Sequence, residues 1–376
     1  MFLSMHKYFI FVSLFVLLLG CDSEKGAPMV TIDGFEDSGT TRRAPSVNVR
    51  FIHLSDDVPI DLIHNVFILN DHLIVLTNKG VFRYDMEGNF IQEISHKGRA
   101  ENEWTTVGPL TIDRSSGTLN IYDTSSKKVL RYSETGDYLG SSPIPDRLFT
   151  VHQAECLDDG RVVFAHGIIN DSGVLYSIED SNYHTLTTVN TVISTKGACE
   201  KIGKHPLSVY GNDVKVLLPF DNKVYRLEGD KLTPCFILNT SKKVLPKSRL
   251  KKIDDYSFNE YKKLMENGFY VGPNNIFENS KHLLLSFFDN DFILIDKESG
   301  EASTFSLQLG NRLDYFPPTG LLNTSSDYFV GVIDVLKANS ISGFIADDCD
   351  DESLLKLKEI ASAPLNSNPF VLLYKF

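Results

Sequence analysis

Ten histidines are the residues of this sequence that most readily suggest chemistry, because imidazole is the commonest metal ligand in proteins. Apart from His6, they are spread along the chain as His53, His64, His72, His96, His152, His166, His184, His205 and His282. No two of them have the short spacing by which a zinc site is recognised from sequence. We therefore predict no metal site and no cofactor, and we interpret single histidines as structural or solvated.

One short stretch combines cationic and aromatic side chains in a chain whose net charge is −12. His96, Lys97 and Arg99 precede the single tryptophan, Trp104, which follows Glu103. Such a set suits a carboxylated glycan or an acidic partner, with the ring as a stacking surface. We predict these four residues as a candidate binding surface. Alternatively, Trp104 packs between structural units and the two cations only pair with neighbouring carboxylates.

The densest acidic run is Asp347-Asp348-Cys349-Asp350-Asp351-Glu352. Carboxylate oxygens bind Ca²⁺, but the run lacks the alternating Asp pattern with a central Gly that calcium loops have. It precedes Ser353–Ala361, whose apolar residues recur at helical spacing. Negative charge is favourable at the start of a helix, so we predict a helix start here, with a calcium site as the alternative.

Four cysteines follow Cys21: Cys156, Cys199, Cys235 and Cys349. They permit three disulfide pairings, but no Cys-x-x-Cys or Cys/His spacing of a metal site is present. We prefer to interpret them as scattered buried thiols and leave their disulfide state open. The sequence also lacks a Gly-x-Ser-x-Gly nucleophile motif, a phosphate loop and a dinucleotide-binding Gly motif, so no catalytic residue is predicted.

The elements that must position these residues are short strands. Leu73–Leu76, Val81–Tyr84 and Phe90–Ile94 are apolar or alternating runs separated by turn residues. Short strands at this spacing indicate an antiparallel meander.

The meander repeats along the chain. Arg83-Tyr84, Gly88 and Phe90 return 48 residues later as Arg131-Tyr132, Gly136 and Tyr138. A period near 50 built from four strands is typical of β-propeller blades. Because this period fits about six times into residues 47–376, we predict an all-β, six-bladed β-propeller of four-stranded antiparallel blades. Seven blades is the alternative.

Three segments depart from the repeat or complete it. Pro246–Gly268 has helical spacing and predicts a short helical insertion between blades four and five, and Ser353–Ala361 predicts a short helix near the C-terminus. Blade five is expected to begin near Phe269. A propeller must close its ring, and Val47–Leu54 with Phe370–Lys375 are the strands predicted to close it.

The first 20 residues are predicted to be a signal peptide. The apolar stretch Phe9–Leu19 is too short to span a bilayer, which needs about 20 residues in a helix. It ends in Leu18-Leu19-Gly20-Cys21, which resembles the lipobox of bacterial lipoproteins. This resemblance implies cleavage between Gly20 and Cys21 and lipidation of Cys21. An ordinary signal peptide with a chance cysteine is the alternative.

Residues 21–46 are predicted to be the lipidated N-terminus and a tether, with a weak strand signal at Val30–Ile32, and residues 47–376 the propeller. Asp22 and Glu24 resemble the short acidic signal that directs lipoproteins of Bacteroidetes to the cell surface. We therefore expect a lipid-anchored protein of the cell envelope, in the outer membrane. In enterobacteria, Asp after the lipidated Cys implies retention in the inner membrane instead.

The stretch from Gly88 to Trp104 is similar to a signature of the six-bladed β-propeller lipoproteins of Bacteroidetes, relatives of the NHL-repeat propellers. Their pattern is G-x-F-I followed by G-x-G-P-G-E-[YF]. Gly98, Glu103 and Trp104 match it, whereas residues 100–102 depart from it. Three further segments resemble the same family: Phe51–Leu54, Val224–Leu227 and Asn368–Lys375.

Two functions follow as hypotheses. The first is a non-catalytic binding or scaffold module for a glycan, a peptide or an envelope protein, attached to the membrane through its lipid. The acidic net charge argues against nucleic acid as a partner. The second is an enzyme of the lyase or hydrolase type with its site at the axial funnel. Because NHL-type lyases bind zinc through histidines on the axis, histidines that converge at one mouth would favour the enzyme.

Overall fold

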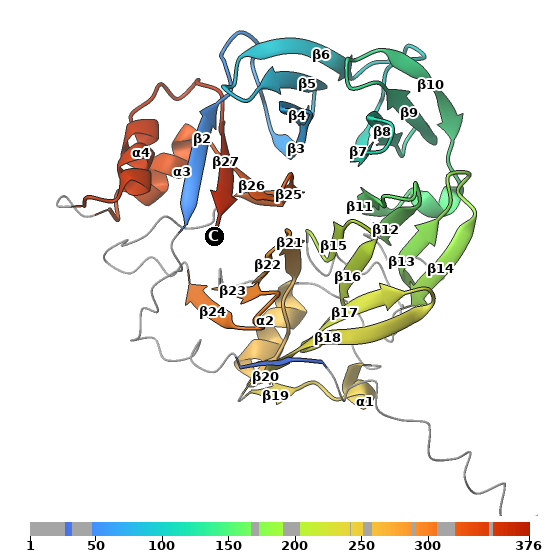
Figure 1. Cartoon of the computed structure of the whole chain (residues 1–376), viewed down its shortest axis with the longest axis vertical. Helices are drawn as coiled ribbons and strands as arrows, with labels where there is room; N and C mark the ends of the chain where they lie inside the picture. The colour runs from blue at the N-terminus through green and yellow to red at the C-terminus, as the bar shows by residue number, and fades with distance from the viewer. Residues whose placement is uncertain are drawn as a thin grey trace, which may run out of the picture.

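The computed structural model describes residues 27–31, 47–166, 173–190, 204–240, 242–250, 258–287, 291–306, 320–345 and 349–376. Over these ranges the chain forms a six-bladed β-propeller of four-stranded antiparallel blades around a central axis (Figure 1). The predicted fold class is therefore confirmed, and the seven-bladed alternative is wrong.

Each blade runs outward from the axis along the chain. Blade 1 contains β3 (Ile63–Leu69), β4 (His72–Thr77), β5 (Gly80–Asp85) and β6 (Phe90–His96). Blade 2 contains β7 (Val107–Asp113), β8 (Thr118–Asp123), β9 (Lys128–Tyr132) and β10 (Tyr138–Pro143). After the 3₁₀ turn η1 (Asp146–Leu148), blade 3 contains β11 (Val151–Cys156), β12 (Val162–His166), β13 (Val174–Glu179) and β14 (Thr185–Asn190).

Blades 4 and 5 follow the same order. Blade 4 contains β15 (Leu207–Tyr210), β16 (Asp213–Leu217), β17 (Lys223–Glu228) and β18 (Lys231–Asn239). Blade 5 contains β21 (Asn275–Glu278), β22 (His282–Ser286), β23 (Asp291–Asp296) and β24 (Ala302–Ser306). Blade 6 takes β25 (Leu321–Ser325), β26 (Tyr328–Ile333) and β27 (Phe370–Lys375) from the C-terminal part of the chain.

The ring is closed by a strand from near the other end of the chain. β2 (Asn48–His53) is the outer strand of blade 6 and pairs antiparallel with β27, from Asn48 opposite Lys375 to His53 opposite Phe370. This confirms the two strands predicted to close the propeller. Pairing strands from distant parts of the chain leaves no open end to the ring of blades.

A short strand, β1 (Met29–Thr31), pairs parallel with the end of β18, with Met29 opposite Ile237. The weak strand signal within the predicted tether thus corresponds to a real strand on the outer edge of blade 4.

The repeat in the sequence has a physical origin that the structure shows. Tyr84 and Tyr132 lie near the end of the third strand of blades 1 and 2, and both are fully buried. Gly88 and Gly136 adopt nearly the same left-handed conformation in the turns that follow, with φ of 89° and 88°. A Cβ at Gly88 would lie 1.9 Å from the carbonyl oxygen of His53 on β2, so only glycine fits this approach.

The predicted insertion between blades 4 and 5 contains α1 (Lys247–Leu250) and α2 (Phe258–Glu266). β19 (Lys243–Val244) and β20 (Phe269–Tyr270) flank these helices and pair parallel with each other. The expected start of blade five at Phe269 was therefore wrong, because this residue pairs outside the blade and the inner strand begins at Asn275.

A helical pair lies beside the outer edge of blade 6 (Figure 1). The predicted helix is α4 (Glu352–Ala361), and the Asp351 carboxylate accepts a hydrogen bond from Leu354 N at 2.9 Å. This cap supports the interpretation of the acidic run as a helix start; Asp347 and Asp348 lie outside the described residues. The other helix, α3 (Val335–Ser342), was not predicted, although Asp334 caps it in the same way.

The core lies between neighbouring blades, where the apolar faces of successive sheets pack together. The cluster between blades 1 and 2, for example, joins Leu76 and Ile94 to Leu110, Leu130 and Trp104. In the described parts of the chain, we find no helix with the length and apolar character needed to cross a membrane.

Candidate functional site

The six inner strands, β3, β7, β11, β15, β21 and β25, surround the axis and end at the same mouth of the propeller (Figure 1). A pocket of about 630 Å³ lies there, and each of the six inner strands contributes to it. We call it the axial pocket. Its wall contains apolar residues at the bottom, such as Phe67 and Ile112, and a larger set of polar ones: Arg114, Glu155, Asp158, Tyr210, Glu278, Asn279, Ser280, Thr324, Ser325, Ser326 and Asp327.

Tight turns shape the rim of the axial pocket. Ser326 and Asp327 both have positive φ, 44° and 69°, as the two central residues of a type I′ hairpin require. Gly211 also has a positive φ of 63°, and a Cβ there would lie 3.3 Å from the Asp158 carboxylate. Because the rim is made of short hairpins on paired strands, its side chains are held by a rigid scaffold.

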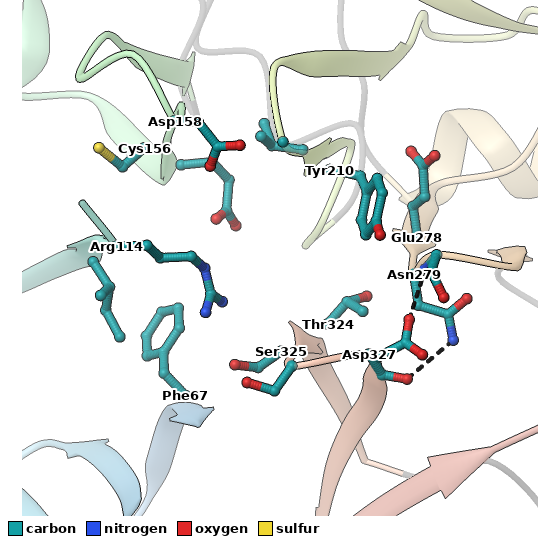
Figure 2. A pocket seen from close by; sticks show the side chains of 16 residues that line it. Phe67, Arg114, Cys156, Asp158, Tyr210, Glu278, Asn279, Thr324, Ser325 and Asp327 are labelled. Carbon is teal, nitrogen blue, oxygen red and sulfur yellow. Dashed lines mark hydrogen bonds between the residues drawn. The ribbon is translucent and has the colours of Figure 1, made fainter. Parts of the chain in front are cut away.

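Arg114, just after the inner strand of blade 2, and Glu155, on the inner strand of blade 3, interact electrostatically. Figure 2 shows the Arg114 side chain extending into the axial pocket, and within the described part of the chain its guanidinium makes no hydrogen bond or ion pair. Glu155 is half-buried at the end of β11. Burial raises the pKa of the Glu155 carboxyl to about 7, against the lowering effects of a hydrogen bond from Gln153 and the charge of Arg114.

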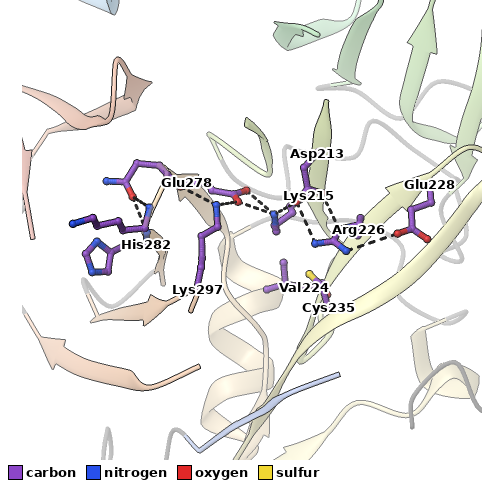
Figure 3. Close-up of polar contacts among 11 residues, drawn as sticks. Asp213, Lys215, Val224, Arg226, Glu228, Cys235, Glu278, His282 and Lys297 are labelled. Atoms are coloured by element: carbon purple, nitrogen blue, oxygen red, sulfur yellow. Dashed lines mark hydrogen bonds and ion pairs between the residues drawn. The ribbon is translucent and has the colours of Figure 1, made fainter. Parts of the chain in front are cut away.

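A buried ion pair joins blades 4 and 5 beside the axial pocket. Lys215 on β16 and Glu278 on β21 are each 1% exposed, and Lys215 Nζ contacts the two Glu278 carboxylate oxygens at 2.7 and 2.9 Å (Figure 3). Lys297 Nζ is also 2.7 Å from Glu278 Oε1. The carboxylate therefore accepts hydrogen bonds from two ammonium groups, which is the arrangement that a buried charge requires.

The same network continues toward the surface of blade 4. Asp213 accepts hydrogen bonds from Lys215 Nζ at 2.6 Å and from Arg226 Nε at 2.8 Å (Figure 3). Burial opposes ionisation of Asp213, but the hydrogen bonds and charges of these two cations lower its pKa overall. Negative and positive side chains thus alternate along the network, from Glu278 at the rim of the axial pocket to the exposed Arg226.

The network also orients an aromatic ring at the rim. Lys297 Nζ lies 4.4 Å from the centre of the Tyr210 ring, a cation–π distance, while Tyr210 remains 45% exposed. Asp327, on the next blade, accepts a hydrogen bond from Ser280 N at 2.8 Å. Burial acts to raise the pKa of Asp327, but the hydrogen bonds from Ser280 and the charges of Lys375 and Lys281 lower it overall.

The predicted binding residues lie elsewhere. β6 runs away from the mouth that holds the axial pocket, so the loop after it, with His96, Lys97 and Arg99, is on the opposite face. Trp104 is 1% exposed and packs between blades 1 and 2, so its ring presents no surface to a ligand. This burial agrees with the alternative that the sequence left open for Trp104.

The other three residues of that set stay accessible. His96 Nε2 lies 2.8 Å from Glu103 Oε1, and Glu103 also accepts a hydrogen bond from Ala100 N, which folds the loop back on itself. Lys97 and Arg99 are exposed and form no side-chain ion pair with any residue that the structure describes. Their role in binding a partner stays a prediction.

Nowhere in the described ranges do three or more His, Cys, Asp or Glu side chains gather in a way that could hold a metal ion. His166, for example, is buried beside Ser177 Oγ at 3.1 Å. Burial lowers its pKa to about 4, and the nearby charges of Glu179 and Arg147 act in opposite directions on it. Its imidazole is therefore neutral and structural at neutral pH.

Three of the four cysteines are in the described ranges, and Cys156, Cys235 and Cys349 are free thiols. Burial raises the pKa of Cys156 to about 12 and that of Cys235 to about 11, so neither is a thiolate at neutral pH. Cys199, the predicted cleavage site after Gly20 and the predicted lipidation site at Cys21 lie outside the described residues.

Sequence reasoning missed Arg114, Glu155, Tyr210 and Glu278. Each is close to the end of an inner strand, at or just before the hairpin that leads to the second strand. Aligning blades by their repeat and marking polar residues at this position would point to Arg114 on blade 2, because blades 1 and 2 are the ones that repeat clearly in sequence. Glu155, Tyr210 and Glu278 lie on blades 3 to 5, which such an alignment does not reach.

The comparisons with known proteins agree with this architecture. A proposed exported protein of Bacteroides fragilis superimposes with a TM-score of 0.67 at 18% identity, over 93% of this chain and 99% of that one. A DUF4221 protein of Bacteroides vulgatus gives a TM-score of 0.51 at 10% identity, over 88% and 98% of the two chains. At these identities the likeness shows the fold alone.

No curated protein sequence matches this chain. A family model does match, and it covers residues 48–375, from the closing strand β2 to the last strand β27. The chain therefore belongs to the family described as a domain of unknown function, DUF4934.

Proposed function

We propose that this propeller is a non-catalytic binding module of the cell envelope, and that it takes its ligand in the axial pocket. The observation that carries the proposal is the pocket itself, about 630 Å³ in volume, at the mouth where all six inner strands end. This volume is within the usual range of ligand sites. One of its charged groups, the Glu278 carboxylate, is held by a network that joins two blades.

A blocking substitution tests the pocket directly. Ser280 is exposed and lines the axial pocket, so Ser280→Trp places a bulky ring at the mouth without emptying the core. Ser340→Trp is the matched control, because Ser340 is exposed on α3, beside the outer edge of blade 6, and does not line the axial pocket. The wild-type protein and both variants would be applied to glycan and peptide arrays. We expect Ser280→Trp alone to lose the wild-type ligands, and ligands retained by both variants would contradict the proposal.

A second candidate function is an enzyme with its site at the same mouth. Glu155, whose pKa is raised to about 7 by burial, has the property of a general acid or base at neutral pH. Among the residues that the structure describes, no group of three or more His, Cys, Asp or Glu side chains could hold a metal ion, and no histidine lines the axial pocket. An enzyme would convert its ligand, so mass spectrometry of each array ligand after incubation separates the two functions.

We also propose that the protein is exported and anchored through lipid on Cys21, in the outer membrane. The support is the sequence Leu18-Leu19-Gly20-Cys21, which resembles a lipobox and follows an apolar stretch. Cys21→Ala is expected to move the protein out of the membrane fraction or to leave it unprocessed, as fractionation and intact mass would show. Unchanged membrane partition and mass would contradict the anchor.

A further inference from the structure

The axial pocket contains a cationic group, Arg114, that no residue described by the structure neutralises by contact. Arg114 is exposed, its side chain extends into the pocket, and its guanidinium has no hydrogen bond or ion pair with the described residues (Figure 2). A guanidinium offers five N–H donors in a planar fork, which matches the two oxygens of a carboxylate. An unpaired guanidinium at the centre of a pocket is therefore suited to bind an anionic ligand.

The acidic groups around Arg114 do not cancel this preference. Glu278 is already bonded to Lys215 and Lys297, both at 2.7 Å from its Oε1 atom. Asp327 already accepts a hydrogen bond from Ser280 N at 2.8 Å, and the charges of Lys375 and Lys281 also act to lower its pKa.

The two remaining carboxyls weaken the field of Arg114 only in part. Burial raises the pKa of Glu155 to about 7, so its carboxyl is partly uncharged at neutral pH. Asp158 is exposed at the rim, where water screens its charge. The carboxylate of a ligand can therefore approach Arg114 without meeting an uncompensated cluster of negative charge.

The rest of the pocket wall indicates what else the ligand carries. Tyr210 is 45% exposed, and Lys297 holds its ring in place at 4.4 Å. A rigid aromatic ring that is partly open offers a flat apolar surface beside polar groups. Ser280 and Thr324 add hydroxyls, and Asp158 adds a carboxylate, so donors and acceptors are interspersed around the ring. A compact ring that bears several hydroxyl groups matches this combination.

We infer that the axial pocket binds a sugar acid, that is, a polyhydroxylated ring with a carboxylate, and that Arg114 binds the carboxylate. The inference rests on the proposed binding function and adds the chemical class of its ligand. No bond of the ligand is broken. Arg114 supplies the charged hydrogen bonds, Tyr210 the flat surface, and the serine and threonine hydroxyls the remaining contacts.

The test uses two probes that differ at their carboxyl groups. Trigalacturonate carries free carboxylates, and its methyl ester keeps the same rings and hydroxyls without the negative charge. The affinity of the wild-type protein for each probe would be measured by titration calorimetry at pH 7. We expect trigalacturonate to bind at least about 10-fold more tightly than the ester, because a hydrogen bond to a charged group contributes about 1.5–3 kcal/mol.

Arg114 is then replaced in the full-length protein. Arg114→Gln is expected to weaken trigalacturonate binding by about 10- to 100-fold and to leave binding of the ester unchanged. Arg114→Lys, which keeps the charge and loses the planar fork, is expected to fall between the two. Arg50→Gln is the control, because Arg50 lies on the outer strand β2, where its guanidinium donates hydrogen bonds to Met86 O and Glu87 Oε1, and it does not line the axial pocket. Unchanged thermal midpoints would show that the variants fold.

Each other outcome contradicts the inference in a distinct way. Equal affinity for acid and ester, lost on Ser280→Trp, overturns the carboxylate ligand while the axial pocket remains a binding site. Binding that survives Ser280→Trp overturns the proposed function as well. If neither probe binds although arrays show ligands blocked by Ser280→Trp, the pocket binds a different class of ligand and the sugar acid is wrong.

Discussion

The contacts between blades 1 and 2 and between blades 4 and 5 occupy equivalent places in the ring, but they are built from different side chains. The first is apolar and centres on Trp104, which is 1% exposed. The second is apolar in part and includes the buried pair Lys215–Glu278. Burying two charges costs desolvation energy that their attraction only partly offsets, so the ionic contact is not the stabler choice.

The difference between the two contacts shows how part of the rim of the axial pocket is held in place. Glu278 and its partner Lys297 are also the groups that hold the rim of the axial pocket, through the Tyr210 ring and the Asn279 backbone. The contact between blades 1 and 2 has no such role, and the polar loop beside Trp104 lies on the opposite face. The ionic contact thus positions groups at the rim of the axial pocket on blades 4 and 5, whereas Arg114 of blade 2 lines the same pocket without such a network.

The largest expected effect on stability comes from a substitution that breaks the apolar contact between blades 1 and 2. Trp104→Ala removes a fully buried ring between two blades and is expected to lower the free energy of unfolding by about 3–5 kcal/mol. Urea unfolding measures this loss, and Trp104→Phe is the control, because it keeps part of the buried area. Ligand binding in the axial pocket is expected to persist. A loss below about 1 kcal/mol would contradict a central role for Trp104 in packing.

The next largest effect on stability is expected from a substitution that breaks the ionic contact between blades 4 and 5. Glu278→Gln leaves the buried Lys215 ammonium facing a neutral amide and is expected to cost about 3 kcal/mol in the free energy of unfolding. Lys215→Met is the partner substitution. Because the two side chains interact directly, we expect the double variant to be less destabilised than the sum of the single variants. Additive losses in urea unfolding would show that the pair is not coupled.

A smaller effect concerns Glu155 and depends on pH. Burial raises the pKa of its carboxyl from 4.5 to about 7 in the folded state, so the folded state binds this proton more tightly than the unfolded state. The resulting destabilisation is absent below pH 4.5, grows between pH 4.5 and 7, and is complete above pH 7. Glu155→Gln is therefore expected to stabilise the protein by about 1–2 kcal/mol at pH 8 and to have no effect on stability at pH 4. The expected gain is smaller than the shift would give at about 1.36 kcal/mol per pKa unit, because the Glu155 side chain is partly exposed.

Urea unfolding of the wild-type protein and Glu155→Gln at the two pH values checks this prediction. Asp158→Asn is the control, since Asp158 is an exposed carboxylate of the same hairpin. Equal stabilisation by Glu155→Gln at pH 4 and pH 8 would contradict a raised pKa.

The smallest effect is at the exposed end of the ionic network. The Arg226 side chain is 44% exposed and pairs with Asp213, so Arg226→Gln is expected to cost about 0–1 kcal/mol. Salt screens such a pair, so the cost is expected to shrink further at 1 M NaCl. A loss as large as that of Glu278→Gln would mean that the charge network acts as one unit rather than as a buried pair with a solvated extension.

The residues of the candidate site show the limits of prediction from sequence. Trp104 was singled out because it is the only tryptophan and stands beside cations, yet those features are equally consistent with a packing residue, and burial distinguishes the two. Arg114 and Glu155 carry no motif. They come together at the axial pocket from two different blades and interact electrostatically, which the spacing of residues in one blade does not predict.

The sequence by itself determined the repeat, the six blades, the closing pair of strands and the positions of the helical insertion and α4. These features depend on short-range properties: alternation of apolar residues, turn residues such as Gly88 and Gly136, and capping by Asp351. Only the tertiary structure decided which face holds the axial pocket and which charges meet there. Lys215 and Glu278 are 63 residues apart in the chain and come together because neighbouring blades pack, a contact that no local pattern specifies.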